Sequence, residues 1–171
     1  TLARALQGLP VEAEIYCTDQ SAPEPAGVDA NTTIILSDSR SDPRRREAHG
    51  HCQAVEAYAR CQVIAIPLHQ TSRLAGLTSL LDAMAMGRAV IMTRNASLEI
   101  DVEREGFGIT VEPSDVSGWR RAILTLLQDP ERVVAMGRRA RERAEDRYTM
   151  GRFTASLAAA LKAAAGRAGQ G

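Results

Sequence analysis

The sequence predicts an α/β domain of the doubly wound type with a mostly parallel sheet. Two short apolar runs, Val63 to Ile66 and Ala89 to Met92, are typical of strands that are buried on both faces. Between them, apolar residues recur at helical spacing from Leu77 to Ala85. A strand, a helix and a second strand in this order form a unit with parallel strands and a right-handed crossover.

The length and the composition are those of one globular domain without an extreme charge. A chain of 171 residues can bury a single core, so we treat residues 1–171 as one domain. Lysine plus arginine number 21, as do aspartate plus glutamate, and this balance does not favour nucleic acid as a partner. We find no apolar run long enough to span a bilayer and no signal-peptide pattern, so we expect a cytoplasmic protein without a transmembrane segment.

The first half of the chain carries the first helix, two strands and the helix that leads into Val63. Loops rich in Asp, Ser, Pro and Gly separate these segments. The expected segments are a helix that ends near Gly8, strands at 11–17 and 32–36, loops at 18–31 and 37–46, and a helix at about 54–61.

Three cysteines, Cys17, Cys52 and Cys61, form an odd and scattered set that favours a reducing compartment over a disulfide framework. The run His49 to Cys52, with Cys61 nine residues later, raises the alternative of a zinc site. Structural zinc usually has two tight ligand pairs, and only one such pair is present here. We therefore expect free thiols and no bound metal.

The second half of the chain continues the alternation and ends in helices. Asp115 and Asp129 precede apolar helical patterns and are expected as N-caps, with Pro130 as the first helical residue. Arginines and acids alternate at helical spacing over 138–146, which indicates a solvated face of ion pairs. The expected segments are a loop at 94–97, a short helix at 98–105, a strand at 109–111, helices after 115 and 129, and a last helix over 153–161.

The junction before Leu77 has the features of a phosphate-binding site. A helix N-terminus presents unpaired N–H groups and the positive end of the helix dipole. Gly76 allows a ligand close to the backbone, Thr78 and Ser79 supply hydroxyls, and Asp82 lies one turn after Thr78, where its carboxylate could accept from a ribose. The alternative is an ordinary strand-to-helix turn in which Thr78 and Ser79 are local caps.

The segment L-L-D-A-M-A-M-G-R-A-V-I-M-T, residues 80–93, resembles the donor site of GT-B glycosyltransferases, particularly the retaining family 4 enzymes. Their common pattern has two glutamates, of which Asp82 matches the second. The first would fall at Leu74, and no carboxylate occurs from Leu68 to Leu81. Ala89 replaces the usual proline. The segment is most similar to a variant branch that reads Gly-x-Thr-Thr/Ser-Leu-Leu-Asp-Ala-Met-Ala.

The resemblance implies the C-terminal, nucleotide-sugar-binding half of a retaining glycosyltransferase of the hexosyltransferase type. It implies a nucleoside-diphosphate sugar such as a UDP-sugar as substrate, no cofactor and no metal, and leaves the catalytic residues unassigned. The acceptor domain would precede this half, together with a first strand, and the full-length enzyme could lie at the inner membrane; these 171 residues alone would be inactive. The expected donor-binding residues are Gly76, Leu77, Thr78, Ser79 and Asp82, with His69 and Asn95 from the neighbouring loops.

Two other functions remain open at this point. The absence of the first acid favours a non-catalytic binding or regulatory module on a glycosyltransferase-like scaffold. A GT-B-shaped sugar-nucleotide epimerase is the third option, although it would carry more acids and histidines around its site. Fold alone does not separate these functions.

Overall fold

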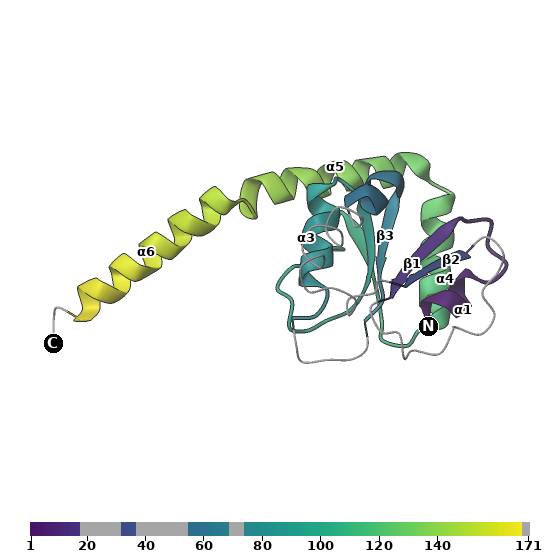
Figure 1. Ribbon diagram of the computed structural model, residues 1–171, viewed down its shortest axis with the longest axis horizontal. Coiled ribbons are helices and arrows are strands. Elements are labelled where there is room, and N and C mark those ends of the chain that lie inside the picture. Colours follow the sequence, from purple (N-terminus) through teal and green to yellow (C-terminus); the bar gives the residue numbers. More distant parts are fainter. Residues whose placement is uncertain (18–31, 37–54, 69–73, 169–171) are drawn as a thin grey trace.

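The computed structural model describes residues 1–17, 32–36, 55–68 and 74–168 (Figure 1). Every expected strand is present, with ends that differ by at most two residues. The elements are α1 (Leu2–Leu6), β1 (Ala13–Cys17), β2 (Thr32–Leu36), a helix over 55–60, β3 (Val63–Ile66), α3 (Leu77–Ala85), β4 (Ala89–Thr93), β5 (Gly108–Val111), α4 (Val116–Leu127), α5 (Pro130–Arg147) and α6 (Met150–Ala168).

All strand pairings are parallel, which confirms the predicted sheet type. β4 lies between β3 and β5, while β1 and β2 pair with each other in a second ladder. The described strands therefore form two ladders where we expected one sheet. An ion pair of 3.2 Å between Glu14, in β1, and Arg60, just before β3, links the amino ends of the two ladders.

Both faces of the three-stranded sheet are covered, as expected of a doubly wound domain. All five residues of β4 are buried. Val90 and Met92 pack with α3 and the carboxyl half of α5, whereas Ala89 and Ile91 pack with α1, α4 and the amino half of α5. Alternate side chains of one strand thus enter two separate cores, which is why β4 reads as a continuous apolar run.

α3 ends as the sequence predicts, in a turn that requires glycine. Gly87 adopts a φ of +64°, and its N–H donates to the Met84 carbonyl, while the Arg88 N–H donates to the Ala83 carbonyl. This pair of hydrogen bonds is the Schellman motif. The turn returns the chain to β4 within three residues.

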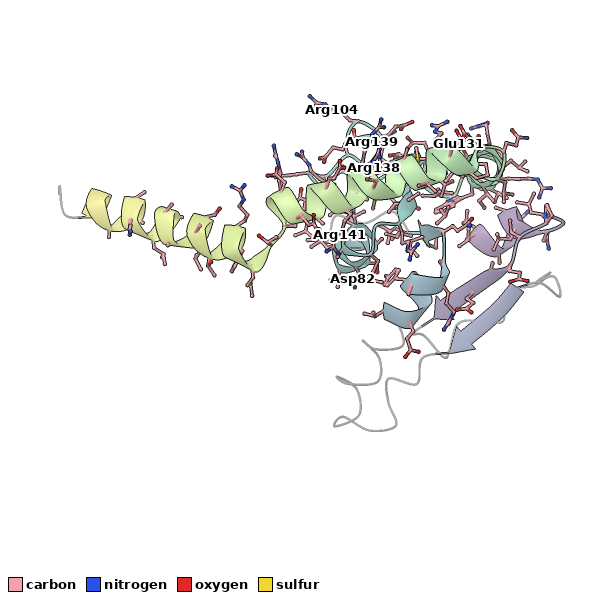
Figure 2. The ribbon with its side chains drawn as sticks, turned by 90° about the horizontal axis from the view of Figure 1, so that it is seen from above. Asp82, Arg104, Glu131, Arg138, Arg139 and Arg141 are labelled. Carbon is pink, nitrogen blue, oxygen red and sulfur yellow. The ribbon has the colours of Figure 1, made fainter. Side chains whose placement is uncertain are left out.

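α5 runs along the amino ends of β3, β4 and β5 (Figure 1). Its Gly137 packs against the backbone of Gly87, in the turn before β4. A Cβ atom built on Gly137 would lie 2.2 Å from the carbonyl oxygen of Gly87. The charged side chains of α5 point outward (Figure 2), and Arg138–Glu142 and Arg141–Glu145 are ion pairs of 3.8 and 2.6 Å, as the helical spacing predicted.

α6 continues beyond α5 as a rod that projects from the body of the domain (Figure 1). Its large apolar side chains are exposed: Met150, Phe153, Leu157 and Leu161. No helix in the described part of the chain is both long and apolar enough to cross a bilayer.

Three expectations need correction or fall outside the described residues. The expected helix at 98–105 is a series of turns, because the Asp101 carboxylate accepts from the N–H groups of Glu103 and Arg104 and closes the chain locally. Ala85, placed on the core face of α3, is exposed. Cys61 is a free thiol, as expected, and burial raises its pKa; the run His49 to Cys52 and the side chain of Cys17 are not described.

We expect Gly137→Ala to destabilise the domain by about 1–3 kcal/mol, the usual cost of overpacking, because the added methyl meets backbone rather than a movable side chain. Gly151→Ala is the matched control, since a Cβ at Gly151 has no neighbour within 4 Å. The measurement is the free energy of unfolding in urea. Equal unfolding free energies for the two variants would contradict the close contact of α5 with Gly87.

Candidate functional site

The predicted site lies at the carboxyl ends of β3 and β4, on the edge of the sheet opposite α5 (Figure 1). β3 ends at Ile66, Pro67 follows, and α3 begins at Leu77. Thr78 is in the first turn of this helix and not in a strand. The expected placement of the junction is therefore confirmed.

Gly76 is the N-cap of α3 and adopts a left-handed conformation with φ +82°. Gly76 has no side chain to cap the helix, and the first intrahelical bond is donated by Leu80 to the Gly76 carbonyl, at 2.9 Å. The N–H groups of the three preceding residues, Leu77 to Ser79, have no bonded partner among the residues that the structure describes. These N–H groups and the helix dipole make the junction suitable for an anion.

Two side chains at the exit of β4 contact the two ends of the loop before α3. The Leu68 N–H donates to the Thr93 hydroxyl at 2.9 Å, and the Asn95 amide donates to the Ala75 carbonyl at 3.2 Å. The Asn95 side-chain oxygen also accepts from the Ser97 N–H, at 3.0 Å. Asn95, expected to bind the donor, is thus hydrogen-bonded to the loop backbone.

Tyr58, from the helix over 55–60, lies close to Ser79 and Asp82. Burial raises the pKa of the Tyr58 hydroxyl, the nearby Ser79 side chain opposes this shift, and the charge of Asp82 adds to it. Tyr58, Ser79 and Asp82 therefore form one half-buried polar group beside the amino end of α3.

The candidate residues differ in their accessibility. Thr78 is exposed, whereas Leu77, Ser79 and Asp82 are half-buried. His69 lies outside the described residues. Leu74, at the position of the missing acid, exposes 61% of its surface.

Sequence reasoning missed Thr93 and Tyr58 as parts of this site. Thr93 is 1% exposed, and the predicted buried strand ended one residue before it, at Met92. Tyr58 read as part of an apolar helical face. A hydroxyl at the carboxyl end of a buried strand was the available signal, because a buried polar group needs a partner.

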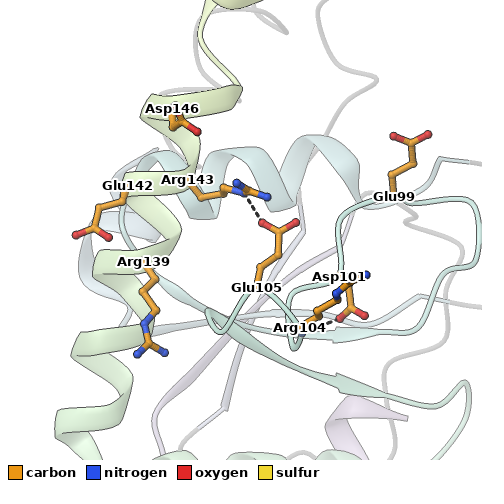
Figure 3. Close-up of a pocket in the computed structure, with 8 residues that line it drawn as sticks. All are labelled: Glu99, Asp101, Arg104, Glu105, Arg139, Glu142, Arg143 and Asp146. Carbon is orange, nitrogen blue, oxygen red and sulfur yellow. Dashed lines mark hydrogen bonds and ion pairs between the residues drawn. The ribbon is translucent and has the colours of Figure 1, made fainter.

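A charged cleft lies elsewhere, between α5 and the segment 99–105 (Figure 3). Arg143 donates to Glu105, and the Arg104 N–H donates to Asp101. The cleft contains none of the candidate residues. It is lined by Glu99, Asp101, Arg104, Glu105, Arg139, Glu142, Arg143 and Asp146.

Comparison of the sequence with known families and proteins gives consistent matches. The family described as glycosyl transferases group 1 matches residues 34–129. A D-inositol 3-phosphate glycosyltransferase of Saccharomonospora viridis is 33% identical over 103 residues, which are 60% of this chain and 23% of that protein. A second, of Corynebacterium kroppenstedtii, is 32% identical over 87 residues, 51% of this chain and 19% of that protein. The chain thus spans about a quarter or less of these relatives.

Solved structures share the fold at low sequence identity. Sucrose-phosphate synthase of Thermosynechococcus elongatus matches with a TM-score of 0.56 and 23% identity over 76% of this chain and 31% of that chain. Anabaena HepE in complex with UDP matches with a TM-score of 0.56 and 15% identity over 80% and 34%. The C-terminal domain of the group 1 glycosyl transferase LpcC of Francisella tularensis matches with a TM-score of 0.52 and 19% identity over 72% and 57%.

We expect Gly76→Ala to destabilise the domain by more than the roughly 1–2 kcal/mol that a left-handed backbone costs a residue with a Cβ. The new Cβ would lie 3.0 Å from a Leu68 methyl and 3.1 Å from an Ile66 methyl. Gly8→Ala is the matched control, because Gly8 has φ +67° and no neighbour within 4 Å of a Cβ. Chemical unfolding of both variants separates backbone strain from contact, and an equal loss in both would refute the close packing at the junction.

Proposed function

The chain belongs to the family of glycosyl transferases group 1 and has the doubly wound fold of the C-terminal half of a GT-B enzyme. We propose that it binds a nucleoside-diphosphate sugar, the donor from which the enzyme transfers the sugar. The observation that carries this proposal is the amino end of α3, at the carboxyl edge of a parallel sheet, whose N–H groups have no partner among the described residues. Open α/β sheets bind ligands at that edge.

The chemistry of the junction supports a nucleoside diphosphate as the ligand. The N–H groups of Leu77, Thr78 and Ser79 and the Thr78 hydroxyl would bind the diphosphate, while the Asp82 carboxylate would accept from the ribose. HepE, which shares the fold, is solved with UDP and with UDP-glucose. We therefore propose a UDP-sugar as the first donor to test.

The proposed catalytic role of the junction is electrostatic. Negative charge builds up on the diphosphate as the bond to the sugar breaks, and oriented N–H groups stabilise it. This contribution needs no metal, in line with the metal-independent, retaining reaction that the resemblance implies. The acceptor and its binding residues would come from a preceding domain.

Three structural features support a preceding domain. β1 and β3 each have one edge without a ladder partner among the described strands, and one further parallel strand between them would join the two ladders. The order would then be β2, β1, the added strand, β3, β4 and β5, which is the usual doubly wound order with the added strand first in the chain. The exposed apolar side chains of α6 offer a surface on which that domain could pack.

A non-catalytic binding module is the second candidate, favoured by the exposed Leu74 where the related enzymes carry an acid. Such a module would bind a nucleotide through α3 without transferring a sugar. A longer form of the protein that hydrolyses no UDP-sugar and transfers none to any acceptor, while binding UDP, would establish this alternative.

We expect Thr78→Ala to weaken UDP or GDP binding by about 1 kcal/mol, the scale of one hydrogen bond. Asp82→Asn should weaken it by about 1.5–3 kcal/mol, because a charged acceptor is lost. Calorimetric titration measures both affinities. Neither variant should unfold the domain, since Thr78 is exposed and Asp82 is half-buried.

Leu80→Ala is the control for these variants. Leu80 is 0% exposed, so its truncation should destabilise the domain by about 2–5 kcal/mol through the cavity that it leaves. Binding by the wild type with unchanged affinity in both Thr78→Ala and Asp82→Asn would show that the nucleotide binds elsewhere.

A further inference from the structure

We propose that Thr93 and Asn95, at the exit of β4, are positioning residues that hold the amino end of α3 at the edge of the sheet, so that β4 sets where the donor diphosphate binds. The proposal rests on the donor site proposed above and assigns it two residues that act through the loop backbone. Neither needs to touch the ligand, because each is hydrogen-bonded to the backbone beside the junction.

Thr93 fixes the point at which the chain leaves β3. The last ladder pair of β3 joins Ile66 to Met92, and the next residue, Pro67, has no N–H to donate. The Leu68 N–H is therefore the first donor after the strand, and it reaches the Thr93 hydroxyl at 2.9 Å. Thr93 is 1% exposed, so the loss of its hydroxyl would leave the Leu68 N–H without this partner at a position shielded from solvent.

Asn95 fixes the other end of the same loop. Its amide nitrogen donates to the carbonyl of Ala75, which directly precedes the N-cap Gly76. Its oxygen accepts from the Ser97 N–H at 3.0 Å, which orients the amide so that the nitrogen faces Ala75. Thr93, at the end of β4, and Asn95, two residues later, thus contact both ends of the loop between β3 and α3.

The two ends of the loop also contact each other. If Gly76 carried a Cβ, that atom would lie 3.0 and 3.4 Å from the two methyl carbons of Leu68. Leu68 therefore packs closely against Gly76. Thr93, Leu68, Gly76, Ala75 and Asn95 consequently form a closed ring of contacts around the start of α3. A shift of about 1 Å in the N–H groups of α3 is enough to weaken a diphosphate contact, so this ring bears directly on binding.

Hydrogen exchange of the ligand-free chain is the first test. Thr93→Val removes the hydroxyl and keeps the shape, and we expect amide exchange to rise by about five- to tenfold, the scale of one hydrogen bond, at Leu68 and at Leu80, whose N–H donates to the Gly76 carbonyl. Asn95→Ala should raise exchange at Leu80 by a similar factor, whereas Thr93→Ser should restore the wild-type rates. The matched control is Thr125→Val, which removes a hydroxyl that donates to the Arg121 carbonyl in α4.

UDP titration of the same variants is the second test. We expect affinity to fall by about three- to tenfold in Thr93→Val and Asn95→Ala and to stay within twofold of wild type in Thr93→Ser and Thr125→Val. Unchanged exchange at both Leu68 and Leu80 in Thr93→Val overturns the positioning role. So does a lower melting temperature in Thr93→Val with unchanged UDP affinity, which is what a purely structural role predicts. Raised exchange in a chain whose wild type binds neither UDP nor GDP supports the ring of contacts and refutes the donor site.

Discussion

The complete burial of β4 is the constraint on which the rest of this structure depends. Its four apolar residues, 89–92, send alternate side chains into two cores, while β3 and β5 occupy both of its edges. A strand in this position has no freedom to slip, because a shift by one residue would exchange the contents of the two cores. The helices on each face, and the loops at each end, are placed relative to this strand.

The two ends of β4 make different kinds of contact. At the amino end, the Gly87 turn and the side-chain-free surface of Gly137 allow α5 to pack against backbone. At the carboxyl end, Thr93 and Asn95 hydrogen-bond to the loop that leads into α3. α5 thus packs at one edge of the sheet, and the ligand site proposed above lies at the other, where open α/β sheets bind ligands.

The site differs from the common pattern of its family in a way that the structure makes concrete. Leu74 is exposed where the resemblance places an acid, and the described part of the chain has polar side chains around the amino end of α3. The donor site proposed above would therefore depend on backbone N–H groups more than on carboxylates. Backbone donors tolerate changes in sequence, provided that the helix start stays in place.

The sequence by itself determined the strands, the caps at Asp115 and Asp129 and the start of α3 at Leu77, since each rests on local periodicity or on a local hydrogen bond. The turns at 98–105 were misread as a helix because Asp101 bonds to nearby N–H groups, an alternative that periodicity does not reveal.

Only the tertiary structure decided the contacts between segments distant in the chain. Thr93 reaches Leu68 across 25 positions, and Tyr58 reaches Ser79 from a different helix. The polarity of such residues is visible in the sequence, but their partners are not, because a hydrogen bond between distant segments is set by how the strands and helices pack.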